Sequence, residues 1–533
     1  MPSRFYITTA IDYVNAEPHL GHAYEKVVTD CLARFHRQIG DETFFLTGTD
    51  EHGLKIARAA EAEGMTPQAF TDRLSGRFRA CYDALGVSYD RFVRTTEPAH
   101  EAAVQGWFRR AHASGDVYTA DYEGLYCVPC EAFYQEKDLV EGTLCPVHRR
   151  PVQKLAERNF FFRLSKYAER LRAHIEAHPE FILPAIRRNE VLGVLAEGLT
   201  DVSISRASVP WGVPVPADVE GAAGHTVYVW VDALLNYVTA IGFPDERYRE
   251  WWVRPGTTAE PNAVHVVGKD ISRFHCLIWP AMLMAAGIPL PKTVFVHGFI
   301  NMGGEKLSKT AGRMVDPLEV AERYGVDALR YYVLREIPFG RDGEFSYEQL
   351  TERYNTDLAN ELGNLVSRTT SMLHRYRAGR VPAAAVEDAR TRAVRELAVT
   401  AEREVVEAYR AYQPSVALET VWTLVKRANR FVEETKPWEL AKAGEAPALD
   451  TALGTLLECA RLAAIWAWPA IPAKCEELWT AIGGGGTPGS LGGNPAMERS
   501  WNAGRAASPL AGRVLPPVTI LFPKIESPVG PAA

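Results

Sequence analysis

The sequence predicts an α/β protein with a parallel sheet, followed by an all-helical region. Between residues 4 and 116, short apolar stretches alternate with stretches of helical period, and the alternation resumes near residue 226. Short strands separated by helices form parallel sheets with right-handed crossovers. After residue 347 only helical patterns follow, which indicates a helical bundle.

Composition narrows the class of protein. The 533 residues are enough for several domains, and the hydrophobic fraction of 47% and charged fraction of 23% are those of an ordinary globular protein. A net charge of −7 argues against a generally basic nucleic-acid binder but leaves room for one basic face. No stretch approaches the roughly 18 apolar residues of a membrane helix, and the N-terminus has no signal pattern. We therefore expect a cytoplasmic protein. Its eight cysteines do not suggest a disulfide framework.

The first strand and helix are expected on either side of His19-Leu20-Gly21-His22. An apolar stretch over residues 5–11 leads into a loop, and a helical pattern follows the motif. A helix start after a strand is a common phosphate site, because free N–H groups and the positive end of the helix dipole face the ligand. The two histidines can add N–H donors, and the glycine leaves room for a flat ring against the backbone. Two hydrogen-bonded histidines at a helix start remain the alternative interpretation of this motif alone.

The second strand is expected over residues 43–49, followed by a polar loop that begins at Asp50. Helices are predicted over residues 66–85 and 99–113. Ligands bind beyond the carboxyl ends of parallel strands, where both Asp50 and the histidine motif are expected. Asp50 can pair with a substrate ammonium group, or it can simply cap a helix.

An insertion begins near residue 117 and carries a cluster of metal-ligand type. Cys127-x-x-Cys130 is followed by Cys145-x-x-His148, a spacing typical of tetrahedral Zn²⁺. With all four positions filled by protein, the site would be structural, and the metal would supply stability that the insertion lacks. The alternative is four unlinked residues in a loop.

Three further strands are expected over residues 226–232, 265–270 and 292–298. Asp270 follows Gly268 and can hold ribose hydroxyls. This second half of the α/β pattern also contains an aromatic set that suits a thioether or a long alkyl side chain, although a plain core is the alternative: Trp230, Tyr237, Phe274, His275 and Trp279.

A loop with the sequence Lys306-Leu307-Ser308-Lys309-Thr310 comes after two glycines. Alone it indicates only a solvated loop. Together with the histidine motif it predicts closure over a triphosphate, where the lysines neutralise charge as pyrophosphate leaves. No Ser-His-Asp elbow, P-loop or dinucleotide fingerprint is present. The favoured chemistry is nucleotidyl transfer, in which a carboxylate attacks the α-phosphate of ATP and Mg²⁺ accompanies the nucleotide.

Helices of the final region are expected over residues 350–376, 389–412, 415–435 and 449–468. A Gly/Pro/Ser-rich stretch from residue 483 to about 516 is expected to be flexible. Residues 519–523 can dock back on the body.

The two signature stretches, HLGH and KLSKT, resemble the HIGH and KMSKS pair of class I aminoacyl-tRNA synthetases. Within that class the sequence resembles the methionyl-tRNA synthetases with a single zinc knuckle, from Phe5 to about Trp479. The most specific segments are DYVNAEPHLGHAY, FLTGTDEHG, YVWVDALLNY, VGKDISRFHCLIWPAML and ANRFVEETKPW. Isoleucyl, leucyl and valyl relatives carry a much larger editing insertion.

This resemblance implies a fold and a function. The function is methionine–tRNA ligation: methionine and ATP form methionyl-adenylate, which is passed to the 3′ end of tRNA(Met), initiator and elongator. It also implies one structural Zn²⁺, Mg²⁺ with ATP, and a monomer. The implied regions are a Rossmann-like catalytic domain in two halves (1–116 and 226–300), a zinc-binding connective insertion (117–225), a KLSKT and stem-contact region (301–348), an anticodon-binding bundle (349–481) and a tail (482–533).

The resemblance also implies roles for individual residues. The implied catalytic set is His19, Gly21, His22, Lys306, Ser308 and Lys309. Further ATP contacts are implied for Glu25, Gly268 and Asp270. The implied methionine pocket comprises Ile11, Tyr13, Asp50, Trp230, Ala233, Tyr237, Phe274, His275 and Trp279. Anticodon contacts are implied for Asn360, Asn364, Arg368 and Trp438, and zinc ligation for Cys127, Cys130, Cys145 and His148.

Leu307 and Thr310 depart from the usual signature, which has Met and Ser there. Both lysines and Ser308 remain, so loop closure is expected to survive. Two other functions fit the sequence less well. A small nucleotidylyltransferase would leave the knuckle and the bundle without a role, and a non-enzymatic tRNA-binding relative would need broken catalytic motifs.

Overall fold

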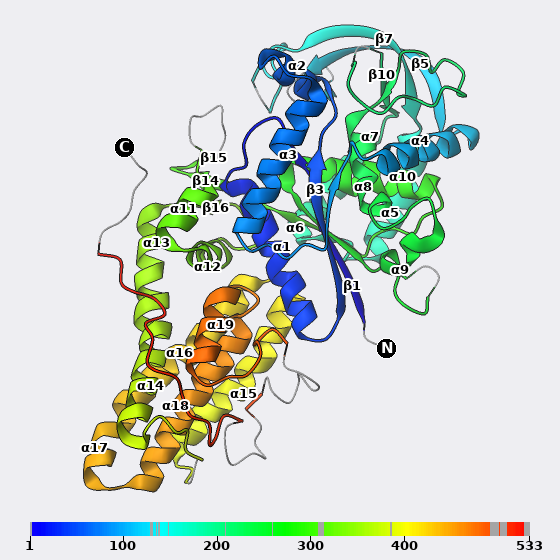
Figure 1. Ribbon diagram of the computed structural model, residues 1–533. Coiled ribbons are helices and arrows are strands. Elements are labelled where there is room, and N and C mark those ends of the chain that lie inside the picture. The colour runs from blue at the N-terminus through cyan, green and yellow to red at the C-terminus, as the bar shows by residue number, and fades with distance from the viewer. Residues whose placement is uncertain are drawn as a thin grey trace.

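The structure is a computed structural model that describes residues 3–127, 132–134, 136, 139–147, 149–207, 209–257, 260–306, 314–383, 386–490, 500–501 and 509–526. A sheet-containing body and a long helical bundle make up the molecule, and the bundle extends away from the body (Figure 1). None of the described helices is long and apolar enough to cross a membrane.

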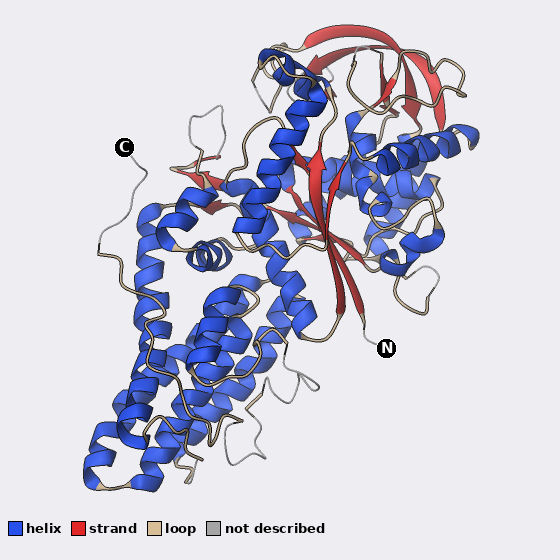
Figure 2. Ribbon diagram, in the orientation of Figure 1, coloured by secondary structure: helices blue, strands red, loops and turns tan. Residues whose placement is uncertain are grey.

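A seven-stranded parallel sheet forms the centre of the body (Figure 2). Its strand order is β2-β3-β1-β12-β13-β8, and β4 pairs with β3. The strands are β1 (Arg4–Thr9), β2 (Asp12–Tyr13), β3 (Glu42–Asp50), β4 (Arg91–Arg94), β8 (Ile182–Leu183), β12 (Ala263–Gly268) and β13 (Thr293–His297). The predicted parallel sheet is confirmed, and the chain returns to it after the insertion, with β12 beside β1.

Helices of the first half connect these strands. They are α1 (Leu20–Gln38), α2 (Leu54–Ala62), α3 (Pro67–Ala84) and α4 (Pro98–Ala113). Proline occupies the first turn of α3 and α4, where a missing N–H costs no hydrogen bond. Most of α1 is buried, because it packs between the sheet and the bundle. This burial fixes the position of the histidine motif at its start.

The insertion has its own antiparallel sheet, in the order β6-β5-β7-β9. Its strands are β5 (Val117–Cys127), β6 (Ala132–Tyr134), β7 (Gln153–Phe162) and β9 (Val202–Ser203). Helices α5 (Ala168–Ala177) and α6 (Ala185–Glu197) flank β8, which returns to the edge of the main sheet beside β13. The insertion therefore shares a sheet with the body.

The strand expected over residues 226–232 is wrong beyond its first two residues. Only Thr226–Val227 is extended, as β11, and it pairs with β10 (Ser205–Arg206) outside the main sheet. Helices α7 (Val229–Leu234) and α8 (Asn236–Thr239) follow. A short apolar stretch fits a buried strand and a buried helix equally well, and here packing decides for the helix. After it come α9 (Arg249–Trp252) and α10 (Trp279–Ala285).

A small sheet of β14 (Ile300–Met302), β15 (Glu305–Lys306) and β16 (Gly343–Glu344) leads into the helical part. The helices are α11 (Pro317–Tyr324), α12 (Val326–Glu336), α13 (Tyr347–Arg353), the π-helical segment Tyr354–Gly363, α14 (Asn364–Arg377), α15 (Ala389–Arg410), α16 (Pro414–Thr435), α17 (Pro437–Ala443), α18 (Ala446–Ala467) and α19 (Pro472–Ala481). The predicted helical bundle is confirmed.

The tail lies along the bundle (Figure 1, red). Leu515 donates its N–H to the Gly379 carbonyl, and Leu521 and Phe522 are buried. Docking of residues 519–523 is thus confirmed. Residues 509–516 belong to the stretch that was expected to be flexible, and in the structure apolar side chains and main-chain hydrogen bonds connect them to α14 and the chain that follows it.

Candidate active site

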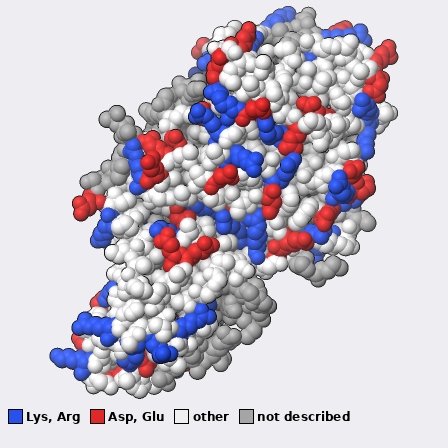
Figure 3. All heavy atoms as spheres, viewed as in Figure 1, with Lys and Arg blue, Asp and Glu red and all other residues white. Residues whose placement is uncertain are grey.

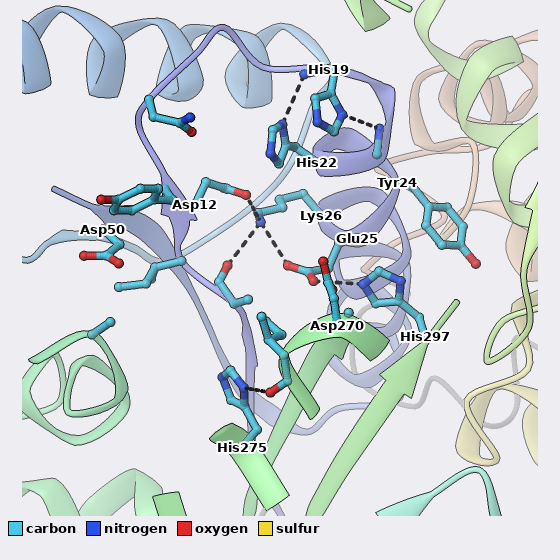
Figure 4. Close-up of a pocket in the computed structure, with 18 of the residues that line it drawn as sticks. Asp12, His19, His22, Tyr24, Glu25, Lys26, Asp50, Asp270, His275 and His297 are labelled. Atoms are coloured by element: carbon cyan, nitrogen blue, oxygen red, sulfur yellow. Dashed lines mark hydrogen bonds and ion pairs between the residues drawn. The ribbon is translucent and has the colours of Figure 1, made fainter. Parts of the chain in front are cut away.

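A cavity of about 500 Å³ opens at the carboxyl ends of β1, β3, β12 and β13. This is the edge at which parallel α/β sheets bind ligands. Figure 4 shows the cavity and the polar side chains that line it. The cavity brings together most of the residues predicted for ATP and methionine: Ile11, Tyr13, His19, Gly21, His22, Glu25, Asp50, Trp230, Ala233, Tyr237, Gly268, Asp270 and His275.

The histidine motif forms a reciprocal cap at the start of α1. The Nδ1 atom of His19 accepts the Gly21 N–H at 3.0 Å, and the Nδ1 atom of His22 accepts the His19 N–H at 3.2 Å. An Nδ1 atom that accepts a hydrogen bond carries no proton, so in each neutral ring the proton lies on Nε2. The two rings stack with centroids 3.8 Å apart. Backbone capping therefore selects the tautomer whose Nε2–H can donate to a phosphate oxygen.

Glycine at position 21 leaves room for the capping contact of His19. A Cβ atom there would lie 2.9 Å from Cε1 of His19, which is closer than real contacts allow. The glycine thus lets the His19 ring reach back to the helix N-terminus.

Below the histidines lies a buried charged cluster that the sequence analysis did not identify as a unit. The Lys26 ammonium group contacts Asp12 Oδ1 at 2.8 Å and Glu25 Oε1 at 2.9 Å (Figure 4). The second oxygen of Glu25 lies 2.9 Å from Nε2 of His297, at the end of β13. Burial alone would raise the Glu25 pKa, but Lys26 and His297 outweigh burial and lower that pKa to about 2. Glu25 is therefore a carboxylate at neutral pH.

Asp50 and Asp270 line the cavity from the ends of two different strands, β3 and β12. Asp50 ends β3 beside Tyr13, its partner in the parallel ladder. Asp270 lies in the short helical turn after β12, and a Cβ atom on Gly268 would lie 2.8 Å from its Oδ1. The glycine therefore allows the carboxylate to fold back over the strand end.

Aromatic residues form the remaining wall. Trp230 lines the cavity from α7 and stacks on Phe274 at 3.8 Å. The Tyr237 hydroxyl donates to Nε2 of His275 at 2.7 Å, and Nδ1 of His275 donates to the Ile271 carbonyl at 3.0 Å. Burial lowers the His275 pKa to about 4, so this ring is neutral.

Two members of the predicted methionine pocket lie behind this wall. Phe274 supports the Trp230 ring but is not among the residues that line the cavity. Trp279 is fully buried, and its indole N–H points to Nε2 of His265 at 3.2 Å. Sequence spacing alone could not show which aromatic residues line the cavity and which lie behind it, because both kinds lie on the same helical turns.

The second catalytic signature lies largely outside the described residues. Lys306 ends β15, its side chain is not described, and Ser308 and Lys309 fall in the undescribed residues 307–313. Met314, which follows directly, lines the cavity.

Comparisons with known proteins agree with this geometry. The family profile described as tRNA synthetases class I (M) matches residues 5–155 and 148–370. The methionine–tRNA ligase of Thermosynechococcus vestitus is 43% identical over 96% of this chain and 96% of its own. That of Mycobacterium tuberculosis is 43% identical over 99% of both chains. The chain belongs to the methionine–tRNA ligase family.

A solved member of the family supports the assignment. The structure of Mycobacterium tuberculosis methionyl-tRNA synthetase in complex with methionyl-adenylate matches with a TM-score of 0.90 and 42% sequence identity. The match covers 98% of this chain and 100% of the other. The α/β body and the helical bundle of this methionine–tRNA ligase are thus those of its family.

Two of the four residues that were predicted to bind zinc belong to the described part of the chain. Cys127 and Cys145 are both fully buried, while Cys130 and His148 lie outside the described residues. Cys127 pairs with Ala132 in the β5–β6 ladder, and the Cys145 carbonyl accepts the Arg149 N–H. No group of three or more potential metal ligands occurs among the described residues. The two buried thiols are the described part of the predicted zinc set.

The residues implied for anticodon contact lie on the bundle, far from the sheet (Figure 1). Asn360 is exposed on the π-helical segment, and Asn364 begins α14. Arg368 pairs with Glu433 across α14 and α16 at 2.7 Å, and Trp438 is 39% exposed on α17. Lys and Arg side chains gather over the outer end of the bundle on the face shown in Figure 3.

Proposed function

We propose that this methionine–tRNA ligase forms methionyl-adenylate in the cavity described above and transfers methionine to the 3′ end of tRNA(Met), initiator and elongator. The observation that carries the proposal is the convergence of Asp50, the aromatic wall and the two histidines on one cavity. Such a cavity offers an ammonium partner, an apolar surface for a thioether and donors for a phosphate. The cytoplasm, where tRNA is charged, is the proposed location.

Activation proceeds without a covalent enzyme intermediate. The methionine carboxylate attacks the α-phosphorus of ATP, and pyrophosphate leaves with Mg²⁺. Positioning and charge stabilisation supply the catalysis. His19 and His22 donate Nε2–H groups to the phosphate oxygens as negative charge builds up. Lys309, with Lys306 and Ser308, stabilises the departing pyrophosphate. The ribose hydroxyl of the tRNA then attacks the methionyl carbonyl, and AMP leaves.

Binding roles follow from position in the cavity. Asp50 receives the methionine ammonium group, and Asp270 with Gly268 receives the ribose. Glu25 lies under the nucleotide side. The methionine thioether contacts one wall of the cavity, and two further aromatic residues lie behind that wall. The wall contains Ile11, Tyr13, Trp230, Ala233, Tyr237 and His275, and the residues behind it are Phe274 and Trp279. A monomer is the proposed working unit.

Zinc is proposed as a structural metal. Cys127, Cys130, Cys145 and His148 would hold it, and it would stabilise the turns of the insertion without entering the reaction. Metal analysis should find about one zinc per chain. Its absence would mean that these residues are unlinked.

Two substitutions test whether methionine activation and recognition of the tRNA anticodon depend on different residues. Lys309→Ala should cripple pyrophosphate exchange while leaving the affinity for tRNA(Met) nearly unchanged. Trp438→Ala should spare exchange and reduce charging, because unpaired anticodon bases stack on exposed aromatic rings. Loss of both activities in either variant would contradict the assigned roles.

A further inference from the structure

Lys26 is a buried charge inside the active-site body. Only 1% of its side chain is exposed, and its ammonium group contacts three acceptors. These are the Ala10 carbonyl at 3.1 Å, Asp12 Oδ1 at 2.8 Å and Glu25 Oε1 at 2.9 Å. An ammonium group has three N–H donors, so each donor has a partner.

The acceptors of Lys26 belong to different sides of the cavity. Ala10 and Asp12 flank Ile11 in the segment that also carries Tyr13, on the proposed methionine side. The outer oxygen of Asp12 accepts the Tyr82 hydroxyl from α3 at 2.6 Å. Lys26 therefore holds the main chain at Ala10 and the side chain of Asp12 on the methionine side of the cavity. The Tyr82 hydroxyl on α3 holds the same Asp12 side chain from the opposite direction.

Glu25 extends the cluster to the nucleotide side. Its second oxygen contacts His297, whose Nδ1 points to the Gly298 carbonyl at 2.7 Å. His297 is the ladder partner of Gly268, next to the proposed ribose ligand Asp270. One ammonium group thus connects β2 to the end of β13 through two carboxylates (Figure 4).

We infer that Lys26 is a positioning residue for methionine activation. It holds two walls of the cavity in register: the methionine wall, here residues 10–13, and the nucleotide wall, here Glu25, His297, Gly268 and Asp270. Without its charge, Asp12 and Glu25 are two buried carboxylates that have lost their common partner. Such a pair moves apart or takes up a proton, and either response releases both walls at once. The inference rests on the proposed activation reaction.

The test compares variants in pyrophosphate exchange. Lys26→Met removes the charge and keeps the length of the side chain. It should lower kcat/KM about 100-fold, with the KM values for methionine and ATP both raised, because misplacing a substrate by about 1 Å costs that much. Asp12→Asn should raise mainly the methionine KM, and Glu25→Gln mainly the ATP KM. Lys26→Arg, which keeps the charge, should recover part of the loss.

A matched control separates positioning from general stability. Arg461 is 1% exposed and pairs with Glu458 at 2.7 Å inside the bundle, far from the cavity. Arg461→Met should lower thermal stability but leave both KM values unchanged. Kinetic constants within about twofold of wild type in Lys26→Met would overturn the inference. If Lys26→Met does not fold, equal changes of both KM values in Asp12→Asn and Glu25→Gln would overturn it instead. Absence of methionine-dependent exchange in the wild type would contradict the proposed function and not the role of Lys26.

Discussion

At the scale of single residues, hydrogen bonds to the main chain decide what each side chain can do. The caps on His19 and His22 place their ring protons on Nε2, and the Ile271 carbonyl places the ring proton of His275 on Nδ1. The residue types and their meeting at one sheet edge could be predicted from the sequence. The tautomers could not, because they depend on angles between atoms only a few ångströms apart.

The buried ion pair of Lys26 and Asp12 is a second residue-scale feature that could not be predicted from the sequence. Lys26 lies in a helical pattern where a lysine normally faces solvent, and Asp12 lies in a strand of two residues. Each is unremarkable alone. Only the tertiary structure shows that they form a pair, because the crossing of β2 and α1 sets the distance between them.

The neutral state of His275 predicts a pH dependence of stability. Its folded pKa is about 4, below the ordinary histidine value of about 6.5. Between these values the unfolded chain binds more protons, so stability falls as pH drops from about 6.5 towards 4, by up to about 3 kcal/mol. His275→Gln should flatten this part of the stability profile in thermal denaturation. The exposed His178→Gln is the control, and an unchanged profile in His275→Gln would contradict the assignment.

At the scale of elements, the helix α7, which takes the place of an expected strand, shapes the aromatic wall of the cavity. Asp232 on α7 accepts from Nδ1 of His52 at 2.7 Å and contacts Nε2 of His100 at 2.9 Å. These contacts anchor the helix that presents Trp230. The sequence contained all four residues but could not decide between strand and helix, because the anchors lie more than a hundred positions away along the chain.

Loosening this anchor should affect methionine more than ATP. Asp232→Asn removes a buried charge between two histidines, so α7 shifts and Trp230 leaves its place in the wall. We expect the methionine KM to rise about tenfold, with little change in the ATP KM. The control is Asp218→Asn, an exposed aspartate that pairs with Arg109. A change confined to the ATP KM would show that α7 does not set the aromatic wall.

At the scale of the whole molecule, the body and the bundle meet at a buried arginine. Arg330 on α12 is fully buried, contacts Asp30 of α1 at 2.6 Å and donates to the Ala470 carbonyl at 2.8 Å. The order of regions along the chain could be predicted from the sequence. The contact between body and bundle could not be predicted, because the partners of Arg330 come from three segments that are far apart along the chain.

Breaking this junction should destabilise the molecule as a unit. Arg330→Met leaves Asp30 buried with fewer partners, a change that typically costs about 3–5 kcal/mol. Calorimetry should show the first unfolding transition at a clearly lower temperature. Arg109→Met removes an exposed pair with Asp218, and its effect should be within about 1 kcal/mol. Equal effects of the two substitutions would contradict the role of Arg330 at the junction.

The central claim is that the cavity activates methionine. The most direct measurement is the exchange of labelled pyrophosphate into ATP without tRNA, with a panel of amino acids as substrates. The account predicts strong exchange with methionine, and exchange with leucine or valine that is weaker by orders of magnitude. Exchange with leucine or valine but not with methionine would contradict it.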